Sequence, residues 1–449
     1  MELYIVEGGE VKTCGATKAI QNEIDKAFLS GGGAVIVPDG EYRVSTIRLR
    51  SRVSLILKKG ARLIASKNPD DYKYSAAGDI EPLENKDLTD VLWEPWNVRK
   101  SYDFMTKPGS RWNDAIIKAI DAENISIIGE EGSYIDGSDC YDASGEERYR
   151  GPHAVNMHRC ENVTLSGYTV KNSANWAHAL FFCKNVKADN VTVLAGHDGI
   201  HVTSCDNVSI KNCKFETGDD CVAGIDNVNV FVSDSEMNTA CSALRFGGTN
   251  VIVSGCRFTG PARYLFRGGL SEEEKKSGVL AESKGKVYNM LSAYTYYSDF
   301  SRPIRYAPEN IIIIENCVFY DTTRFLHYNF SGNEPWQRNR PLGNITFKNI
   351  KAEGISMPLT LYGDETEKVT LKIEDSEINL KENFGSEFIR AANYDKIVLK
   401  NVKIKNFDGE ALVKKWSDGG EVLLRNADFE SNDIKTETTA NEPFVCKTI

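Results

Sequence analysis

The sequence lacks the features that would tie it to a membrane or to nucleic acid. No run of about 18 apolar residues, the length that spans a bilayer, occurs in its 449 residues. Acidic residues outnumber basic ones by 64 to 54, for a net charge of −10, which opposes broad electrostatic binding of nucleic acid or an anionic membrane surface. We therefore expect neither nucleic acid nor a membrane among its partners.

Cysteine motifs and a secretion signal are also missing. The chain has 11 cysteines but no CxxC pair and no cluster of Cys and His with metal-ligand spacing, so we expect reduced, mostly structural thiols, no metal site and no cofactor. The start, MELYIVEGGEVKTCGATKAI, has no apolar segment behind basic residues, which favours a cytoplasmic protein. Nothing in the sequence indicates the oligomeric state.

What the sequence does have is a repeated element. It consists of Asn, then Val or Ile, then alternating apolar positions, in a chain whose 41% hydrophobic content is ordinary for a folded protein. Five successive copies are anchored at Asn162, Asn185, Asn207, Asn227 and Asn250, and Asn229 is an equally good anchor for the fourth. The steps of 23, 22, 20 and 23 residues hold short strands but no crossover helix.

Parallel strands without crossover helices must come from coiling. The predicted fold class is therefore all-β, a right-handed parallel β-helix, with one domain over residues 1–449. The Asn of each copy is expected at a corner in the left-handed conformation, with its amide bonded to the next copy. Five cysteines recur near the repeat and are expected to pack inside the coils: Cys160, Cys183, Cys205, Cys256 and Cys317.

Three segments depart from the repeat. Residues 17–30 carry apolar side chains at helical spacing behind Thr17, a candidate N-cap, and are expected to form a helix that covers the open end of the first coil. Residues 72–114 and 268–307 are long insertions. Loops of this length in a solenoid usually serve function, and we expect them to wall the active-site groove.

Three aspartates fall at the interval of the repeat. Asp198 precedes Asp219 by 21 residues and Asp220 by 22, so the three should stack on neighbouring turns. Gly218 favours a bend that lets the two adjacent carboxylates reach one cleft. Such a cluster suits acid/base hydrolysis of a glycosidic bond, whereas the alternative is that the aspartates are only turn residues.

The motifs around these aspartates resemble those of glycoside hydrolase family 28, the polygalacturonase family, and the resemblance covers most of the chain. Gly196-His197-Asp198 stands at the family's Asn-Thr-Asp motif, Gly218-Asp219-Asp220 at its Gly-Asp-Asp motif, and NSANW at 172–176 is similar to its NS-x-x-W. The resemblance implies that Asp219 is the general acid, and that Asp198 and Asp220 activate water for inversion.

Two other motifs of that family have no match. Its Gly-His-Gly would fall at residues 240–242, where Cys241 replaces the histidine, and its Arg-Ile-Lys would fall near Arg267. We therefore expect a substrate other than that of an ordinary polygalacturonase.

Side chains near the motifs are candidates for binding the substrate. Arginines could fork onto a uronate or sulfate, histidines beside Asp198 could hold hydroxyls, and tyrosines could stack on sugar faces. Solvated arginines, ordinary loop histidines and packed tyrosines are the alternatives. The predicted substrate-binding residues are His197, His201, Cys241, Arg245, Arg263, Arg267, Tyr294, Tyr296 and Arg302.

Together these features predict an inverting glycoside hydrolase for a pectin-like or otherwise acidic or modified oligosaccharide. Insertions that close one end of the groove favour exo action on short substrates. Two alternatives remain: a non-catalytic carbohydrate-binding β-helix, and a lyase or uronate epimerase on the same scaffold, which would use a Lys, Arg or Tyr base, often with Ca²⁺.

Overall fold

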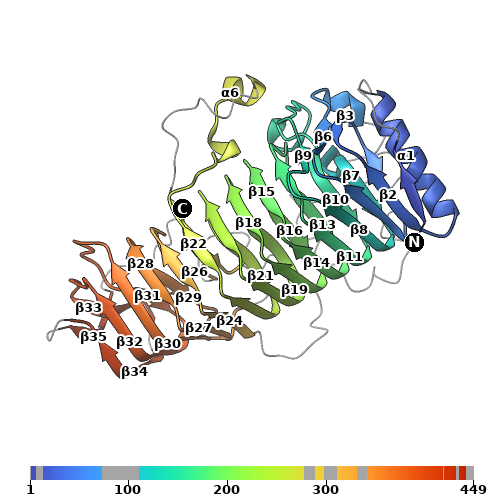
Figure 1. Cartoon of the computed structure of the whole chain (residues 1–449). Helices are drawn as coiled ribbons and strands as arrows, with labels where there is room; N and C mark the ends of the chain where they lie inside the picture. Colours follow the sequence, from blue (N-terminus) through green and yellow to red (C-terminus); the bar gives the residue numbers. More distant parts are fainter. Residues whose placement is uncertain are drawn as a thin grey trace. The chain divides into compact units, whose positions relative to one another are not determined.

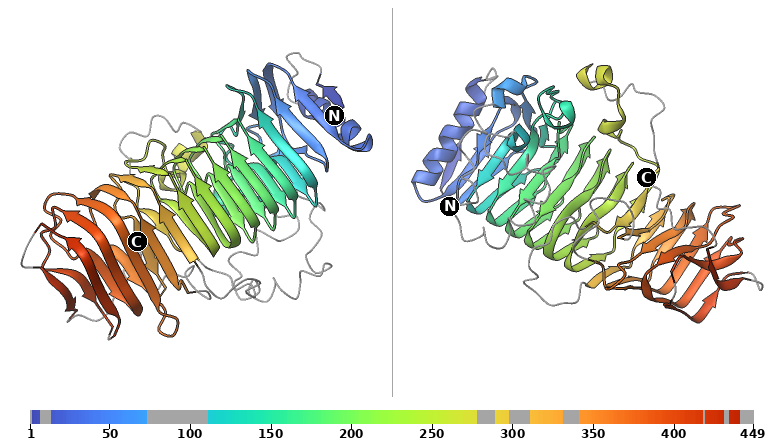
Figure 2. Two further views of the ribbon diagram at one scale, coloured as in Figure 1. Left: turned by 60° about the horizontal axis from the view of Figure 1, so that its bottom comes forward. Right: turned by 180° about the vertical axis from the view of Figure 1, so that it is seen from behind.

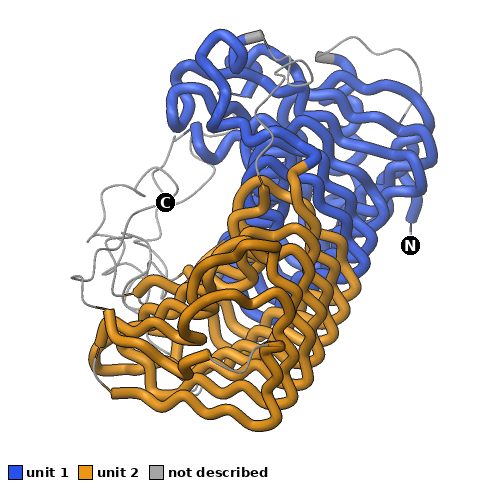
Figure 3. Tube along the Cα trace, turned by 90° about the vertical axis from the view of Figure 1, so that its left-hand side faces the viewer, with its two compact units in different colours: residues 1–223, 263–287 blue, residues 224–262, 288–449 orange. Residues whose placement is uncertain are grey.

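The protein divides into two compact units in a computed structural model. The model describes residues 2–6, 14–72, 111–277, 289–297, 311–330, 341–417, 419–430 and 434–440. The first unit holds residues 1–223 and 263–287 and the second holds residues 224–262 and 288–449 (Figure 3). The single domain expected from the sequence stays a prediction. Most of both predicted insertions, residues 73–110, 278–288 and 298–307, lies outside the described residues.

In the first unit the strands stack in three parallel columns, coil upon coil (Figures 1 and 2). The first column holds β1 (Leu3–Ile5), β2 (Gly33–Val37), β5 (Val53–Leu57), β8 (Glu123–Gly129), β11 (Glu161–Ser166), β14 (Lys184–Asp189) and β17 (Asp206–Lys211). The second holds β3 (Gly40–Val44), β6 (Ala61–Ala65), β9 (Tyr134–Asp136), β12 (Thr169–Lys171), β15 (Thr192–Ala195) and β18 (Lys214–Thr217). The third holds β4 (Ile47–Arg48), β7 (Ala115–Ile120), β10 (His153–His158), β13 (His178–Phe181) and β16 (Ile200–Thr203).

The second unit repeats this arrangement, but some of its strands run through two columns: β21 runs from the third column into the first, and β30 and β32 run from the first into the second. Its first column holds β19 (Val222–Ser233), β21 (Ser242–Ser254), β24 (Ile311–Glu315), β27 (Asn344–Lys348), β30 (Val369–Leu380), β32 (Tyr394–Lys405) and β34 (Glu421–Asp428). The second adds β20 (Glu236–Thr239), β22 (Arg257–Thr259), β25 (Val318–Tyr320) and β28 (Lys351–Ile355), and the third adds β23 (Ser292–Thr295), β26 (Leu326–Asn329), β29 (Leu359–Tyr362), β31 (Ile389–Ala392), β33 (Ala411–Lys415) and β35 (Lys435–Thr439).

Alternation along each strand decides which side chains form the core. In β11 the side chains of Val163 and Leu165 are buried, and Val163 pairs in register with Val186 of the next coil. Like side chains therefore stack at the strand spacing of about 4.8 Å. The predicted packing of the five cysteines inside the coils is confirmed, since all five are buried and free.

Asparagines hold the corners between coils, as predicted. Asn162, Asn185 and Asn207 have φ values of 57°, 54° and 58°, in the left-handed region that Asn tolerates. Each amide bonds the one before it: Asn185 Nδ2 donates to Asn162 Oδ1 and Asn207 Nδ2 to Asn185 Oδ1, both at 3.0 Å. In the second unit the corresponding bond joins Asn250 to Asn229 at 3.1 Å, so Asn229 is the anchor of the fourth copy.

The predicted capping helix is α1 (Cys14–Leu29), which packs against β2 and β3. It begins before Thr17, so the predicted N-cap is wrong. The Thr17 hydroxyl instead accepts a hydrogen bond from the Ser45 amide at 3.0 Å. The helix ends where Gly31 takes a φ of 96°, a conformation that glycine adopts at little cost.

The other helical segments are short: η1 (Pro69–Tyr72), η4 (Arg111–Asn113), η5 (Glu146–Arg148), η6 (Arg267–Gly269) and α6 (Glu272–Ser277). Within the described ranges, no helix has the length and apolar character needed to cross a membrane.

Candidate active site

Three aspartates from two successive corners of the first unit form one cluster. Asp198 lies between β15 and β16, and Asp219 and Asp220 lie between β18 and β19. One carboxylate oxygen from each lies within 4.8 Å of the others. Asp198 and Asp220 are buried, whereas Asp219 is half-buried. The structure thus brings together the three carboxylates that the repeat interval placed on neighbouring turns.

Backbone register explains why the aspartates meet. The Ala177 amide donates to the Asp198 carbonyl at 2.8 Å, and the Gly199 amide donates to the Asp220 carbonyl at 2.9 Å. Trp176, Asp198 and Asp220 therefore occupy equivalent positions in three successive coils. By the same register, Asn175, His197 and Asp219 occupy the preceding positions.

A bend at Gly218 allows both adjacent aspartates to join one cluster. The chain leaves β18 at Thr217, whose hydroxyl donates to the Asp219 carbonyl at 2.7 Å. A Cβ at Gly218 would lie 2.1 Å from the carbonyl oxygen of Leu265, so only glycine fits there. The Asp220 amide donates to Oδ1 of Asp219 at 3.1 Å and so fixes one carboxylate relative to the next.

His201 supports the first of these carboxylates. Its Nδ1 donates to Oδ2 of Asp198 at 2.8 Å. Its ring is stacked on Trp176, with the centroids 3.5 Å apart and the planes within 3°. Both side chains are buried, so the imidazole is held from one face and from one edge. His201, predicted as a substrate-binding residue, is placed to orient Asp198.

His197 directly precedes Asp198 in the chain and is fully buried. Arg150 Nη1 donates to its Nδ1 at 3.0 Å, and Tyr149 stacks on the imidazole with the centroids 5.8 Å apart. Burial, followed by the nearby Arg150 and Arg267 charges, holds the pKa of His197 well below its usual range. The ring is therefore neutral.

Two glutamates near the cluster were missed by the sequence analysis. Glu146 and Glu147, in η5, each place Oε2 3.0 Å from Nε of Arg150. Burial raises the pKa of Glu146 to about 7; the Arg150 charge opposes this, and Glu147, Asp198 and Asp219 add to it. These two residues belong to no copy of the repeat and to none of the family 28 motifs. The run of charged residues in which they lie was the one signal in the sequence that could have indicated them.

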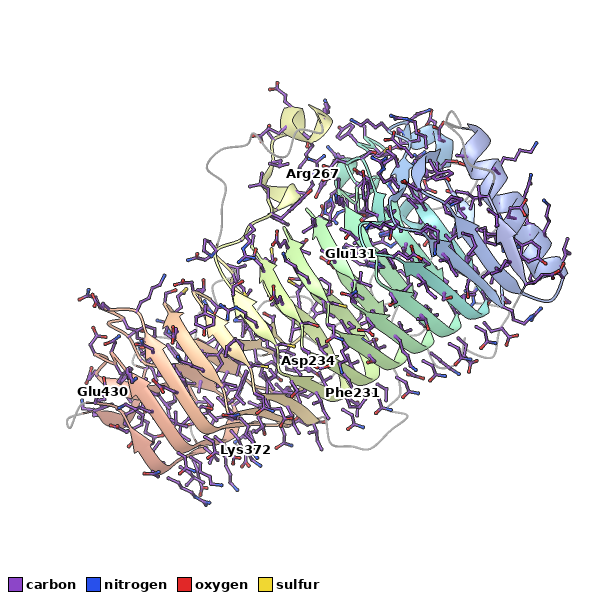
Figure 4. The ribbon with its side chains drawn as sticks, in the orientation of Figure 1. Glu131, Phe231, Asp234, Arg267, Lys372 and Glu430 are labelled. Carbon is purple, nitrogen blue, oxygen red and sulfur yellow. The ribbon has the colours of Figure 1, made fainter. Side chains whose placement is uncertain are left out.

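The segment from Arg263 to Ser277 returns to the first unit and lies beside the cluster. The Arg267 amide donates to the Gly196 carbonyl at 3.1 Å, and the same segment supplies the Leu265 carbonyl that faces Gly218. We call residues 263–269 the return segment; Arg267 is labelled in Figure 4. It forms a wall at the two corners that carry the aspartates.

The two arginines predicted in this segment differ in exposure. Arg267 is 3% exposed, and its Nη2 lies 3.7 Å from Oδ1 of Asp139 and donates to the Lys275 carbonyl at 3.2 Å. Arg267 therefore does not lie at the surface, where its guanidinium could fork onto a substrate anion. Burial raises the pKa of Asp139 to about 7 against the Arg267 charge. Arg263 is exposed, and its Nη1 lies 3.2 Å from Oε1 of Glu216.

The other predicted substrate-binding residues belong to the second unit or lie outside the described residues. Cys241 and Arg245 are half-buried, and Arg245 stacks its guanidinium on Tyr297 with the carbon 4.4 Å from the ring centroid. Tyr294 lies on β23 and Tyr296 just after it. Their predicted role as open sugar platforms is wrong, because the two residues are 1% and 0% exposed and belong to the core. Arg302 is not among the described residues.

The aspartate cluster also has the ligand type of a cation site. Three carboxylate oxygens within 4.8 Å could bind a hard cation such as Ca²⁺. Hydrolysis by paired carboxylates requires no metal. The predicted absence of a metal stays a prediction.

The fold and the cluster define a right-handed parallel β-helix protein with three carboxylates gathered at two stacked corners. Residues 99–242 match the model of glycosyl hydrolases family 28. A probable polygalacturonase from Vitis vinifera is 26% identical over 219 residues, which are 46% of this chain and 40% of that one. An exo-poly-alpha-D-galacturonosidase from Dickeya chrysanthemi is 24% identical over 237 residues, 46% of this chain and 38% of that one.

A solved structure extends the likeness in fold to nearly the whole chain. The hyperthermoactive exopolygalacturonase from Thermotoga maritima has a TM-score of 0.56 and 18% identity, covering 90% of this chain and 91% of that one. The segment that matches the family 28 model, residues 99–242, contains all three aspartates. The chain spans less than half of the length of the two curated relatives. The resemblance to family 28 was expected over most of the chain, whereas the family model matches residues 99–242.

Proposed function

We propose that the protein is an inverting glycoside hydrolase for a pectin-like or otherwise acidic or modified oligosaccharide, and that it acts from a chain end. The observation that carries this proposal is the cluster of Asp198, Asp219 and Asp220 within 4.8 Å at two stacked corners. The family 28 match and the names of the curated relatives support the class of reaction and of substrate.

Each aspartate takes a role that fits its exposure. Asp219, half-buried, gives its proton to the glycosidic oxygen as the bond to the anomeric carbon breaks. Asp198 and Asp220, both buried, take a proton from the water that attacks the same carbon. His201 orients Asp198 through the 2.8 Å bond. The hydroxyl group of the water joins the anomeric carbon and the protonated oxygen leaves with the other sugar; the base pair then releases its proton to solvent, and Asp219 takes one up.

The stereochemical outcome needs its own test. Inversion is implied by the resemblance to family 28, and the structure gives only that one oxygen of each carboxylate lies within 4.8 Å of the others. Proton NMR of the first product formed distinguishes the outcomes. We expect the inverted anomer to appear first and then to mutarotate. If the retained anomer formed first, one carboxylate would act as a nucleophile, and the role of activating water given to Asp198 and Asp220 would be wrong.

Variants at the cluster test the activity. We expect Asp219→Asn and Asp198→Asn to lower the release of reducing ends from pectic oligosaccharides by at least about 10²-fold. The matched control is Asp121→Asn, which removes a carboxylate paired with Arg159 at another corner of the first unit. Equal rates for Asp219→Asn and wild type would exclude the proposed acid.

The same assays separate the alternative functions. A carbohydrate-binding β-helix would bind the oligosaccharides without releasing reducing ends. A lyase would give an unsaturated product with strong ultraviolet absorbance. Products cut at random inside a polymer would contradict exo action. The cytoplasmic location stays a prediction of the sequence.

A further inference from the structure

Arg150 lies at the centre of a buried polar network beside the aspartate cluster. Its guanidinium contacts four side chains: Oε2 of Glu146 and of Glu147 at 3.0 Å each, Oδ1 of Asn175 at 3.3 Å, and Nδ1 of His197 at 3.0 Å. The side chain is 8% exposed. A guanidinium held by this many partners has little freedom to reach a ligand.

The network determines which nitrogen of His197 carries the proton. A guanidinium has only donors, so Nδ1 of His197 must accept the bond from Arg150. The neutral ring then carries its hydrogen on Nε2. Burial, and then the charges of Arg150, Arg267 and Lys275, favour the neutral ring, and the stacked Tyr149 holds its plane.

The Nε2–H group lacks a hydrogen-bond partner among the described residues, although His197 is fully buried. Buried donors without a partner are rare in native proteins and call for an explanation. The two nitrogens point away from each other on the ring. Arg150 occupies Nδ1 and bonds Asn175 of the preceding coil as well, so Nε2–H is the one group of the ring left for a further partner. The residue at the equivalent position of the following coil is Asp219.

We propose that His197, held by Arg150 as the Nε2–H tautomer, is a positioning residue that supplies a hydrogen-bond donor to the carboxyl group of Asp219 during the reaction. This inference rests on the proposed function, because it assigns His197 a task in the same site. It replaces the role of a substrate-binding residue predicted from the sequence. Arg150 acts one step further away, by fixing the tautomer.

Two substitutions of His197 distinguish this role from simple packing. The amide nitrogen of Gln can occupy the place of Nε2, whereas the side chain of Asn reaches only the place of Nδ1. We expect His197→Gln to keep kcat within about tenfold of wild type and His197→Asn to lower it by about 10²-fold, the usual cost of a lost donor at a reacting group. Because the proposed partner of His197 is Asp219 and not the sugar, KM should change little in both variants.

The opposite order would overturn the proposal. If His197→Asn kept more activity than His197→Gln, the contact with Arg150 would matter and the Nε2–H donor would not. Thermal unfolding of both variants accompanies the kinetics. If each variant lost activity in proportion to its loss of thermal stability, His197 would have a packing role alone, and the proposal would be wrong.

A measurement without substrate tests the tautomer directly. In protein labelled with ¹⁵N at its six histidines, long-range NMR correlations report which nitrogen of each ring is protonated. We expect the His197 signal, identified by its loss in His197→Gln, to show the Nε2–H form. The Nδ1–H form would overturn the proposal even if the enzyme is active. An inactive wild type with the Nε2–H form would instead refute the proposed function and leave the tautomer intact.

Arg150→Met completes the test, with Arg159→Met as its matched control. Arg159 follows β10 as Arg150 precedes it, and it forms a two-point ion pair with Asp121 at 2.7 and 2.9 Å. We expect Arg150→Met to lose the single Nε2–H form and to lower kcat as His197→Asn does, while Arg159→Met changes neither. An unchanged His197 tautomer in Arg150→Met would contradict the role given to the arginine.

Discussion

The imidazole of His201 joins Asp198 through a 2.8 Å hydrogen bond at an angle set by a second buried ring. Trp176 lies 3.5 Å from the imidazole centroid and parallel to it, one coil before Asp198 in the same column. The orientation of the carboxylate therefore depends on an interaction between coils and on the local turn.

The first prediction concerns this pair. His201→Leu removes the donor, whereas His201→Asn keeps an amide nitrogen near the place of Nδ1. We expect His201→Leu to lower kcat by about 10–100-fold, since small displacements of a reacting group can cost this much, and His201→Asn to lower it less. Initial rates at saturating oligosaccharide measure the effect. Wild-type kcat in His201→Leu would show that Asp198 needs no support.

The second prediction concerns the bend before Asp219. In Gly218→Ala the new methyl group meets the Leu265 carbonyl at 2.1 Å, so the bend or the return segment must shift. We expect a loss of about 1–3 kcal/mol in the free energy of unfolding, as in other overpacked sites, and a clear fall in kcat. Gly343→Ala is the control, because a Cβ there meets no atom within 4 Å. Equal kcat in the two variants would contradict the need for glycine at 218.

The third prediction is a dependence of stability on pH. His178 is fully buried, its Nδ1 donates to the Gly199 carbonyl at 3.0 Å, and Nε2 bonds the Tyr168 hydroxyl at 2.9 Å. Burial lowers the pKa of His178 to about 4, against the bond to Gly199. Below about pH 6.5, the ordinary pKa of histidine, His178 binds a proton in the unfolded chain but stays neutral in the folded chain. The free energy of unfolding therefore falls as the pH drops from about 6.5 to about 4.

A pH series of unfolding measurements checks this dependence. The depressed pKa corresponds to about 3 kcal/mol of unfolding free energy lost across that range. We expect His178→Gln to be less stable than wild type at neutral pH, and the gap to narrow as the pH is lowered. A gap that stays constant with pH would rule out His178 as a source of acid sensitivity.

The fourth prediction separates the two roles of the corner asparagines. Asn185 has a φ of 54° and bonds both Asn162 and Asn207. Asn185→Gly loses both bonds but tolerates the conformation, whereas Asn185→Ala loses the bonds and strains the backbone by about 1–2 kcal/mol. We expect the alanine variant to be the less stable in urea unfolding. The reverse order would mean that backbone entropy outweighs the strain.

The sequence predicted the coil and the aspartate cluster because both follow its period. A step of about 22 residues brings Asn185 above Asn162, and by the same step Asp220 lies above Asp198. Where side chains obey the period, their neighbours can be counted along the chain.

Contacts outside the period could not be counted in this way. Arg150 reaches His197 from a segment that follows no repeat, and Arg267 reaches Asp139 across an equally irregular connection. Tyr294 and Tyr296 were placed in a loop because a long insertion hides the short strand β23. In each of these cases the partner is decided by burial in three dimensions, which the spacing of residues does not contain.

The hydrogen bond between the Arg267 amide and the Gly196 carbonyl affects the order in which the protein folds during its synthesis on the ribosome. Domains fold largely in the order in which they are synthesised. Gly196 and Gly218 are made first, but the segment that walls them is made only after residues 224–262, which belong to the second unit. A nascent chain stopped before Arg267 would hold all three aspartates and still lack this wall. The cluster would therefore be enclosed only after about 50 further residues beyond Asp219 have been added to the chain.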